Sequence, residues 1–364
     1  MLLDIEEAIR SARESSFADS TSDLHVEGNE PPWQRVDGAM QRTDLPVVEP
    51  ESVRIFCETY LSKKEYERLN SQHGAADGAI QHPSFGAVRI HAFRGENGLA
   101  LSLRLLRGGV PELDSLGLPA IVSSFADFPT GLVLFTGPTG SGKSTTIASL
   151  LDRLNATEAK HIMTFEDPVE YTHEWLKSVV TQYEVGRDIA TFADGVRGSL
   201  RADPDVLFIG ELRGLETASA ALQAAETGHL VFAALHTPSE TPLAINRIIG
   251  LFPSEEQERA RTRLADALRA LVGLRLLPLR EGNGLRAAAE IVIASEAVRR
   301  IIRDGATHQL RATIASSRKD GMQTLESHLS ELVSSGDVEL GAARAASLYP
   351  EEVRELPAGS FRRR

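Results

Sequence analysis

One segment, residues 137–144, restricts the possible folds of this chain more than any other. It reads Gly-Pro-Thr-Gly-Ser-Gly-Lys-Ser and matches the pattern G-x-x-x-x-G-K-[ST] in full. The apolar run Gly131–Thr136 precedes it, and apolar residues at positions 147, 150, 151 and 154 follow at helical spacing. A strand, a glycine-rich turn and a helix N-terminus in this order present backbone N–H groups to an anion. The sequence therefore predicts a phosphate-binding loop.

The side chains of this loop indicate a nucleoside triphosphate as the ligand. We expect Lys143 to reach the β- and γ-phosphates and the Ser144 hydroxyl to ligate Mg²⁺. The predicted cofactors are ATP and Mg²⁺, and the predicted activity is Mg-dependent ATP hydrolysis. The residues expected to bind the nucleotide are Gly137, Pro138, Thr139, Gly140, Ser141, Gly142, Lys143, Ser144 and Thr145.

Short apolar runs separated by helical stretches predict the fold around this loop. The runs are Gly131–Thr136, His161–Phe165, Asp205–Ile209 and Leu230–Leu235. Each is short enough for a strand buried on both faces, which is typical of an α/β, doubly wound, mostly parallel sheet. From about Glu255 onward the pattern reads as mostly helical.

The residues before the phosphate loop have a different pattern, which predicts a smaller α+β domain. A helix is expected within residues 1–20. Alternating stretches near residues 24–26, 35–38, 87–93 and 99–105 predict half-buried strands, and residues 49–69 are expected to be helical. The predicted domains are 1–107, a linker 108–120, an ATPase domain 121–356 with a helical C-terminal part, and a tail 357–364.

Acidic residues follow two of the predicted parallel strands. Glu166, Asp167 and Glu170 follow the second apolar run, and Glu211 follows the third. Ligands of open parallel sheets bind outside the carboxyl ends of the strands, so these acids should converge near the phosphates. Hydrolysis needs a group that activates water and a carboxylate associated with Mg²⁺. The pattern alone does not say which acid has which task.

Histidines lie at both ends of the fourth run. His229 and His236 are seven residues apart, and an extended strand of that length spans about 23 Å at ~3.3 Å per residue. A shared metal is therefore not expected. His236 should lie at the carboxyl end, near the γ-phosphate, as a polar sensor, and a histidine held by structural hydrogen bonds is the alternative.

Composition narrows the possible functions further. The net charge of −12 disfavours a nucleic-acid partner. The single cysteine, Cys57, excludes an intrachain disulfide and a tetracysteine zinc site. The acidic start shows no signal peptide, and no apolar run is long enough to span a membrane. A cytoplasmic location is expected, with any membrane association made through a partner.

Several segments together resemble the secretion ATPases of type IV pili and type II secretion, and most of all their pilus-retraction (PilT-like) branch. They are residues 137–146, Thr164–Glu170, Asp203–Arg213 and Ala225–Thr237, together with 22–25 and 31–38 near the start. The resemblance extends from about Asp23 to Tyr349. The missing tetracysteine insertion, the short sequence before Ser22 and the segment Ala297–Arg303 favour the retraction branch.

The resemblance implies a RecA-like ATPase domain, a PAS-like N-terminal domain and a role for each candidate residue. Glu170 would activate the attacking water, and Glu211 would be the Mg-associated glutamate. His229 and His236 would form the family's histidine pair. Arg89 and Arg104, otherwise read as surface charges on strands, would reach toward the nucleotide phosphates.

The resemblance also implies a hexamer that is peripheral to the inner face of the cytoplasmic membrane and acts on an inner-membrane pilus platform protein. The expected function is ATP-driven pilus retraction. The sequence departs from the family's usual residues at Tyr183, Gly214, Asn246, Leu274 and Arg300. These departures leave a divergent paralogue, acting as a nucleotide-binding regulator or accessory ATPase, as one alternative. A nucleic-acid translocase on the same fold is another, disfavoured by the charge.

Overall fold

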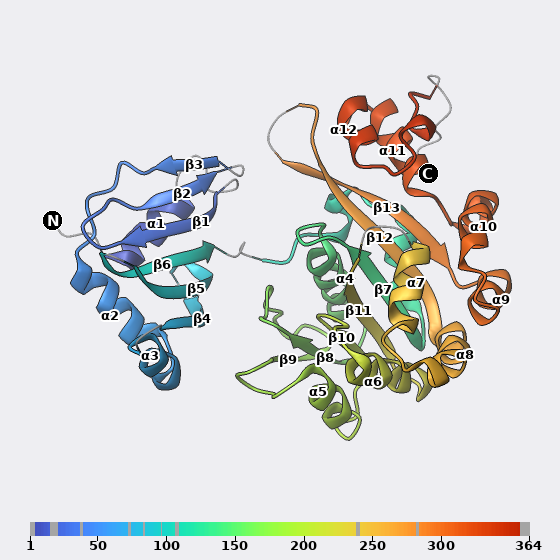
Figure 1. The fold of residues 1–364 in the computed structure, drawn as a ribbon, viewed down its shortest axis with the longest axis horizontal. Helices are drawn as coiled ribbons and strands as arrows, with labels where there is room; N and C mark the ends of the chain where they lie inside the picture. Colours follow the sequence, from blue (N-terminus) through green and yellow to red (C-terminus); the bar gives the residue numbers. More distant parts are fainter. Residues whose placement is uncertain are drawn as a thin grey trace. The chain divides into compact units, whose positions relative to one another are not determined.

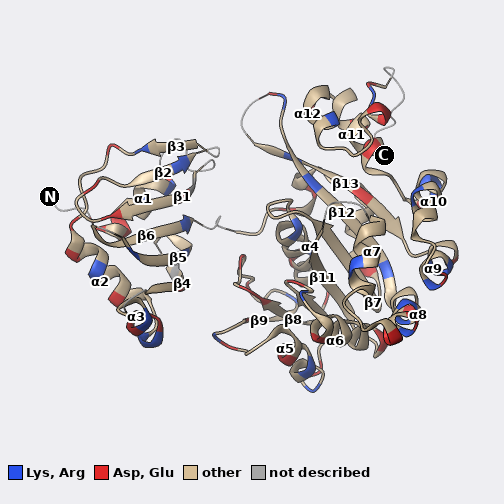
Figure 2. Cartoon of the chain, viewed as in Figure 1, with Lys and Arg blue, Asp and Glu red and all other residues tan. Residues whose placement is uncertain are grey.

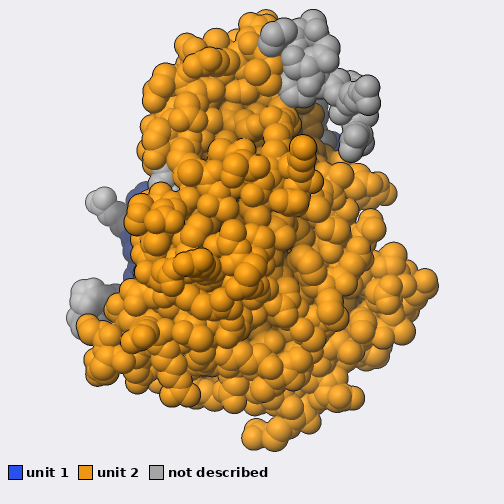
Figure 3. Space-filling model, turned by 90° about the vertical axis from the view of Figure 1, so that its right-hand side faces the viewer, with its two compact units in different colours: residues 1–109 blue, residues 110–364 orange. Residues whose placement is uncertain are grey.

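The computed structural model divides the chain into two compact units, residues 1–109 and 110–364 (Figure 1, Figure 3). It describes residues 4–14, 21–36, 39–71, 74–82, 84–95, 97–105, 109–237, 241–281 and 284–356. The predicted tail 357–364, the linker residue Gly108 and parts of the expected first helix lie outside the described residues. Acidic and basic residues are interspersed along the chain in both units (Figure 2).

Unit 1 contains an antiparallel sheet in the order β3-β2-β1-β6-β5-β4. Its strands are β1 (Thr21–Glu27), β2 (Trp33–Val36), β3 (Ala39–Arg42), β4 (Ala75–His82), β5 (Gly86–Gly95) and β6 (Gly98–Leu105). Its helices are α1 (Ile5–Glu14), α2 (Pro50–Tyr60) and α3 (Lys63–Leu69). Side chains alternate between the two faces of the sheet along β6. Leu101, Leu103 and Leu105 are buried in the core of unit 1, while Arg104 points to the other face.

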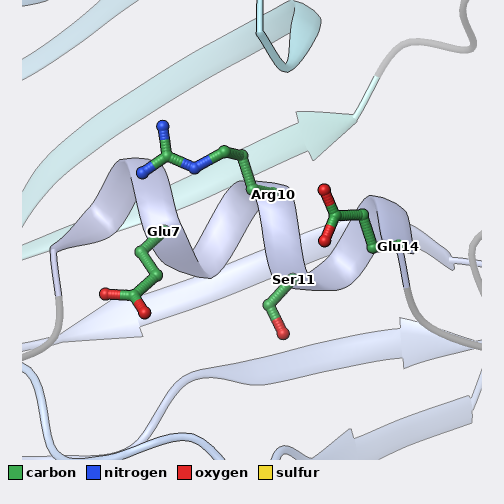
Figure 4. Close-up of a pocket in the computed structure, with 4 residues that line it drawn as sticks. All are labelled: Glu7, Arg10, Ser11 and Glu14. Carbon is green, nitrogen blue, oxygen red and sulfur yellow. The ribbon is translucent and has the colours of Figure 1, made fainter.

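Helix α1 shows the same division between a buried and a polar side. Ile5, Ala8, Ile9 and Ala12 are buried in the core of unit 1. Glu7, Arg10, Ser11 and Glu14 line a pocket along the polar side of this one helix (Figure 4). These four side chains are not among the predicted site residues.

Unit 2 is built on a sheet in the order β13-β12-β7-β11-β10-β8-β9, in which only the β12–β13 pair is antiparallel. Its strands are β7 (Gly131–Gly137), β8 (His161–Glu166), β9 (Val179–Glu184), β10 (Val206–Ile209), β11 (Leu230–His236), β12 (Leu268–Pro278) and β13 (Leu285–Ile293). Its α-helices are α4 (Lys143–Thr157), α5 (Phe192–Ser199), α6 (Leu215–Glu226), α7 (Thr241–Ile249), α8 (Gln257–Ala267), α9 (Glu296–Arg303), α10 (Leu310–Ser316), α11 (Leu325–Ser334) and α12 (Leu340–Ala345). Short 3₁₀ helices span Leu113–Leu116, Ala120–Asp127, Ser254–Glu256, Thr307–Gln309, Arg318–Asp320 and Pro350–Glu352.

Alternate residues of the parallel strands supply two separate cores, one on each face of the sheet. In β7, Leu132 and Leu134 belong to one core, whereas Val133 and Phe135 belong to the other. Burial on both faces explains why these strands read as continuous apolar runs. The predicted doubly wound α/β fold is confirmed, and each of the four apolar runs forms a strand.

The expectation of a mostly helical region after Glu255 is wrong for residues 268–293. Within that range, β12 (Leu268–Pro278) and β13 (Leu285–Ile293) form a long antiparallel pair at the edge of the sheet. The apolar run of β12 carries no alternation, because most of its residues are buried, so periodicity could not separate strand from helix. Residues 110–120, expected within the linker, belong to unit 2, where Leu113 packs into the core beside α4.

Candidate functional site

The phosphate loop lies between the last residue of β7 and the first residue of α4. Gly137, Gly140 and Gly142 have φ values of 145°, 74° and 89°. At Gly137 an added Cβ would approach the backbone oxygen of Leu274 to 2.5 Å. A side chain at position 137 would therefore clash with β12, so the loop needs glycine there.

Lys143 folds back over this loop. Its Nζ donates to the carbonyl oxygens of Gly137 at 2.9 Å and Pro138 at 2.7 Å. Burial lowers the pKa of Lys143, while the nearby carboxylates of Glu211 and Glu170 raise it. The ammonium group is thus held at the loop by carbonyl dipoles that an anion could replace.

The Ser141 hydroxyl gives independent evidence that the loop fits a ligand. Its Oγ is buried and lacks a hydrogen-bond partner, and the residue is 2% exposed. A buried polar atom without a partner costs free energy, so it indicates a group that would pair with it when bound. Phosphate oxygens are suitable acceptors for a hydroxyl at this position.

Acidic residues from two adjacent strands lie at the same edge of the sheet as the loop. Strand β10 pairs with β8, so Glu211 and the segment after Glu166 leave the sheet side by side. Arg213 links the two segments, since its Nε donates to Glu211 Oε2 at 2.6 Å and its Nη1 to Asp167 Oδ2 at 3.4 Å. Glu170 and Glu211 are both close enough to Lys143 to influence its pKa.

The two predicted histidines lie at different ends of β11. His236 is paired across the strands with Gly137, the first glycine of the phosphate loop, and its Nε2 lies 3.7 Å from Glu211 Oε2. Burial, Lys143 and nearby arginines lower the pKa of His236, while Glu211 raises it. His229 precedes β11, and its Nδ1 lies 2.9 Å from the Ala224 oxygen. Within this unit His236 joins the site, whereas His229 holds the turn after α6.

Arg89 and Arg104 lie in unit 1, directly opposite each other on β5 and β6. Arg104 Nε donates to Asp23 Oδ1 at 2.9 Å, and the buried Nε of Arg89 has no hydrogen-bond partner. Like charges directly opposite in a sheet repel. The carboxylate of Asp23 offsets part of this repulsion, and the relation of the two arginines to the phosphate loop stays a prediction.

Other polar residues of the site were not found from the sequence. Thr164 and Gln182 donate to Glu166, Arg213 donates to Glu211, and the Tyr171 hydroxyl pairs with Thr145 in α4. The sequence did contain a signal for these residues. Polar residues alternate at the ends of two neighbouring strands, namely Thr164 with Glu166 and Gln182 with Glu184. These strands pair in the register Thr164 to Gln182.

The departures from the usual family residues have local explanations. The ring of Tyr183 stacks on Phe165, and Leu274 is fully buried in the core behind the phosphate loop. Asn246 accepts a hydrogen bond from Thr307 Oγ1 at 3.2 Å. Gly214 is the N-cap of α6 with an extended φ of −155°. None of these positions supplies a charge to the phosphate loop.

The segment Ala297–Arg303 forms most of α9, and Val298, Ile301 and Ile302 are buried as predicted. Arg299 caps the end of α8, because its guanidinium donates to the carbonyl oxygens of Ala265, Asp266 and Leu268. Arg300 is exposed and pairs with Asp304. The motif therefore holds α8 and β12 together.

The side chains of the site bear on whether it could hold a metal ion. Within the part of the chain that the structure describes, no group of three His, Cys, Asp or Glu residues could hold a metal ion. Mg²⁺ is commonly held by one or two protein groups together with phosphates and waters, so Ser144 and Glu211 fit that pattern. None of the described helices is long and apolar enough to cross a membrane.

Comparisons with known proteins agree with this geometry. The sequence model of the family "Type II/IV secretion system protein" matches residues 4–339. The type IV pilus retraction ATPase PilT of Pseudomonas aeruginosa is 39% identical over 92% of this chain and 97% of its own length. A twitching motility protein of Neisseria gonorrhoeae is 38% identical over 88% and 86%. The crystal structure of the pilus retraction motor PilT with bound ADP superposes with a TM-score of 0.87 at 38% identity, covering 97% of this chain and all of that one.

Proposed function

The chain belongs to the type II/IV secretion system protein family, and from this premise we propose that it is an ATP-hydrolysing motor that drives retraction of type IV pili. The observation that carries the proposal is the convergence of Lys143, Glu170 and Glu211 at one sheet edge, beside a phosphate loop with an unpartnered buried hydroxyl. Relatives that match nearly the full chain are a pilus retraction ATPase and a twitching motility protein.

Each residue of this edge has a task that its position supports. The loop backbone and Lys143 would bind the β- and γ-phosphates, and Ser144 and Glu211 would hold Mg²⁺. Bound Mg²⁺ would neutralise phosphate charge in the transition state. Glu170 orients the attacking water and accepts its proton. His236, between Gly137 and Glu211, senses the γ-phosphate, and His229 is assigned by resemblance alone.

The motor is proposed to work as a hexamer. Arg89 and Arg104 would stabilise charge on the transferring phosphoryl group, as arginines do in other nucleotide hydrolases. The partners would be further copies of this chain and an inner-membrane pilus platform protein, with the ring peripheral to the cytoplasmic face of that membrane. Sedimentation with a non-hydrolysable ATP analogue should give a species near six times 39.5 kDa.

The Glu170→Gln variant tests the chemical step. The amide keeps the shape of the side chain but cannot accept the proton, so ATP binding should persist while turnover falls by at least ~100-fold. Asp167→Asn is the matched control from the same segment, since Asp167 pairs with Arg213 and turnover should stay within a few-fold. If both substitutions lower turnover by the same small factor, Glu170 is not the residue that activates water.

A deletion strain tests the biological role. Loss of twitching with an excess of surface pili is expected for a retraction motor, whereas loss of pili would indicate an assembly motor. If the purified wild-type hexamer releases no phosphate above background, the alternative of a nucleotide-binding regulator replaces the motor.

A further inference from the structure

The segment between β8 and β9 carries Glu170, and side chains from those strands hold its backbone in place. Residues 167–178 form no helix or strand. The backbone N–H of Val169 donates to Glu184 Oε2 at 3.3 Å, and that of Glu170 donates to Glu166 Oε2 at 3.3 Å. Without such partners these buried or half-buried amides would be unsatisfied. The conformation of the segment therefore depends on side chains of β8 and β9.

Gln182 makes the largest number of these contacts. Its Nε2 donates to Tyr171 O at 2.8 Å and to Glu166 Oε1 at 3.2 Å, while its Oε1 accepts from His173 N at 3.0 Å. The reverse amide orientation would place an NH₂ group against a backbone N–H, so the network fixes which way the amide points. One side chain thus holds the backbone at Tyr171 and His173 and also contacts the carboxylate of Glu166.

Tyr171 connects this arrangement to the phosphate loop. Its hydroxyl lies 3.0 Å from Thr145 Oγ1, in the first turn of α4. Glu166 meanwhile accepts from Thr164 Oγ1 at 2.7 Å. A continuous set of hydrogen bonds therefore runs from Thr145 through Tyr171 and Gln182 to Glu166, and from Glu166 to the backbone of Glu170.

We propose that Gln182, acting through Glu166 and Tyr171, is the positioning residue that sets Glu170 relative to the phosphate loop. The inference rests on the proposed role of Glu170 in hydrolysis. It assigns Glu166 to holding the segment and not to activating water, because Glu166 is 6% exposed and its two oxygens already accept three hydrogen bonds. Gln182 lies on the edge strand β9, and its amide bonds to Tyr171, His173 and Glu166, which all lie outside the phosphate loop.

The Gln182→Leu variant removes the amide while keeping a side chain of similar size. A shift of about 1 Å in a catalytic group can cost ~100-fold in rate, so kcat should fall ~10- to 100-fold. Because the substitution removes none of the residues proposed to bind nucleotide, the KM for ATP and the affinity for a non-hydrolysable analogue should stay within about twofold of the wild type. This split between kcat and KM is not expected from general loss of structure.

Gln323→Leu is the matched control. Gln323 is a half-buried glutamine whose Nε2 donates to the Ala289 oxygen at 3.1 Å, between β13 and the residues before α11. The same substitution there removes a similar backbone contact away from the site. Its kcat should stay within about twofold of the wild type. A folded Gln182→Leu variant with a kcat as close to the wild type as that of Gln323→Leu would overturn the proposal.

A second variant, Gln182→Glu, covers the case in which Gln182→Leu does not fold. The titratable groups around this position are Glu166, Glu170, Tyr171, His173 and Glu184. Two carboxylates at positions 182 and 166 cannot both ionise at low cost, and a shared proton would restore the missing donor. The ratio of variant to wild-type kcat should therefore rise at least several-fold as the pH falls from 8 to 6. A ratio that does not change with pH would contradict the positioning role.

Failure of the proposed function would give a different result. If wild-type protein hydrolyses ATP and Glu170→Gln is inactive, but Gln182→Leu and Gln182→Glu behave as wild type, only the positioning role is lost. If Glu170→Gln remains active, the premise itself is wrong.

Discussion

Replacing the buried carboxyl of Glu166 should make the protein more stable at neutral and alkaline pH. Burial raises the pKa of Glu166 from its ordinary value of 4.5 to about 7, although hydrogen bonds from Thr164, Glu170 and Gln182 lower it. Between these two values the native state holds a proton that the unfolded state has lost. The contribution of Glu166 to stability is therefore complete below about pH 4.5 and is lost as the pH rises through 7.

The size of this loss follows from the two pKa values. Each pKa unit is worth ~1.4 kcal/mol, so moving from 4.5 to about 7 costs the native state about 3 kcal/mol above pH 7. A glutamine carries no charge, but its NH₂ group cannot accept the N–H of Glu170, which costs about 1 kcal/mol. Glu166→Gln should thus stabilise unit 2 by about 2 kcal/mol at pH 8 and destabilise it by about 1 kcal/mol at pH 4.5, with the curves crossing near pH 5 to 6.

Tryptophan fluorescence during urea unfolding can measure this effect. The chain has two tryptophans, and in a Trp33→Phe background the signal comes from Trp175, whose Nε1 donates to the Val180 oxygen in β9. The quantity to compare is the difference in unfolding free energy between wild type and variant, because other groups titrate equally in both proteins. His328, for example, is held neutral by burial with a pKa of about 4 and gives the opposite slope. Glu158→Gln, an exposed position after α4, serves as control. If the difference in unfolding free energy between wild type and Glu166→Gln stays constant from pH 4.5 to 8, the raised pKa of Glu166 does not affect stability in this way.

Two further substitutions test the predicted nucleotide contacts. Lys143→Ala should abolish tight ATP binding or turnover, measured by equilibrium binding and phosphate release, because it removes the charge opposite the β- and γ-phosphates; near-normal activity would reject the site. Arg104→Ala should leave ATP binding within a few-fold but lower turnover ~10³-fold or more, as expected for an arginine that stabilises the transition state. Arg94→Ala, on the neighbouring strand β5, is the control for Arg104, and an equal effect of the two would show that Arg104 has no special role.

The parts of the site that lie on the main chain could be predicted from the sequence. The pattern at residues 137–144 dictates a backbone geometry, and the structure shows why, since a Cβ at Gly137 would clash with β12. Glu211 and the acids after β8 were expected together because parallel strands end at the same edge of a sheet. Both inferences depend on the chain direction and the strand order, which the apolar runs reveal.

The remaining features depend on contacts that a linear pattern does not contain. Gln182 was not singled out from the sequence, because its three partners lie nine to sixteen positions away along the chain. Strands β12 and β13 were missed because most of β12 is buried and so lacks the alternation that identifies a strand. Likewise, the pairing of Arg89 opposite Arg104 required the register of β5 and β6.

The electrostatics of the site suggest which part of it responds to nucleotide. Burial disfavours the charge on both Lys143 and Glu166, lowering the pKa of the former and raising that of the latter. Bound phosphate groups would place negative charge beside Lys143 and so would offset the free-energy cost of burying its ammonium group. Nucleotide would not stabilise the charge of Glu166 in this way. The hydrogen bonds from Thr164, Gln182 and the backbone of Glu170 would remain the groups that stabilise it. ATP binding should therefore tighten the phosphate loop, while the placement of Glu170 depends on the contacts of β9 in every nucleotide state.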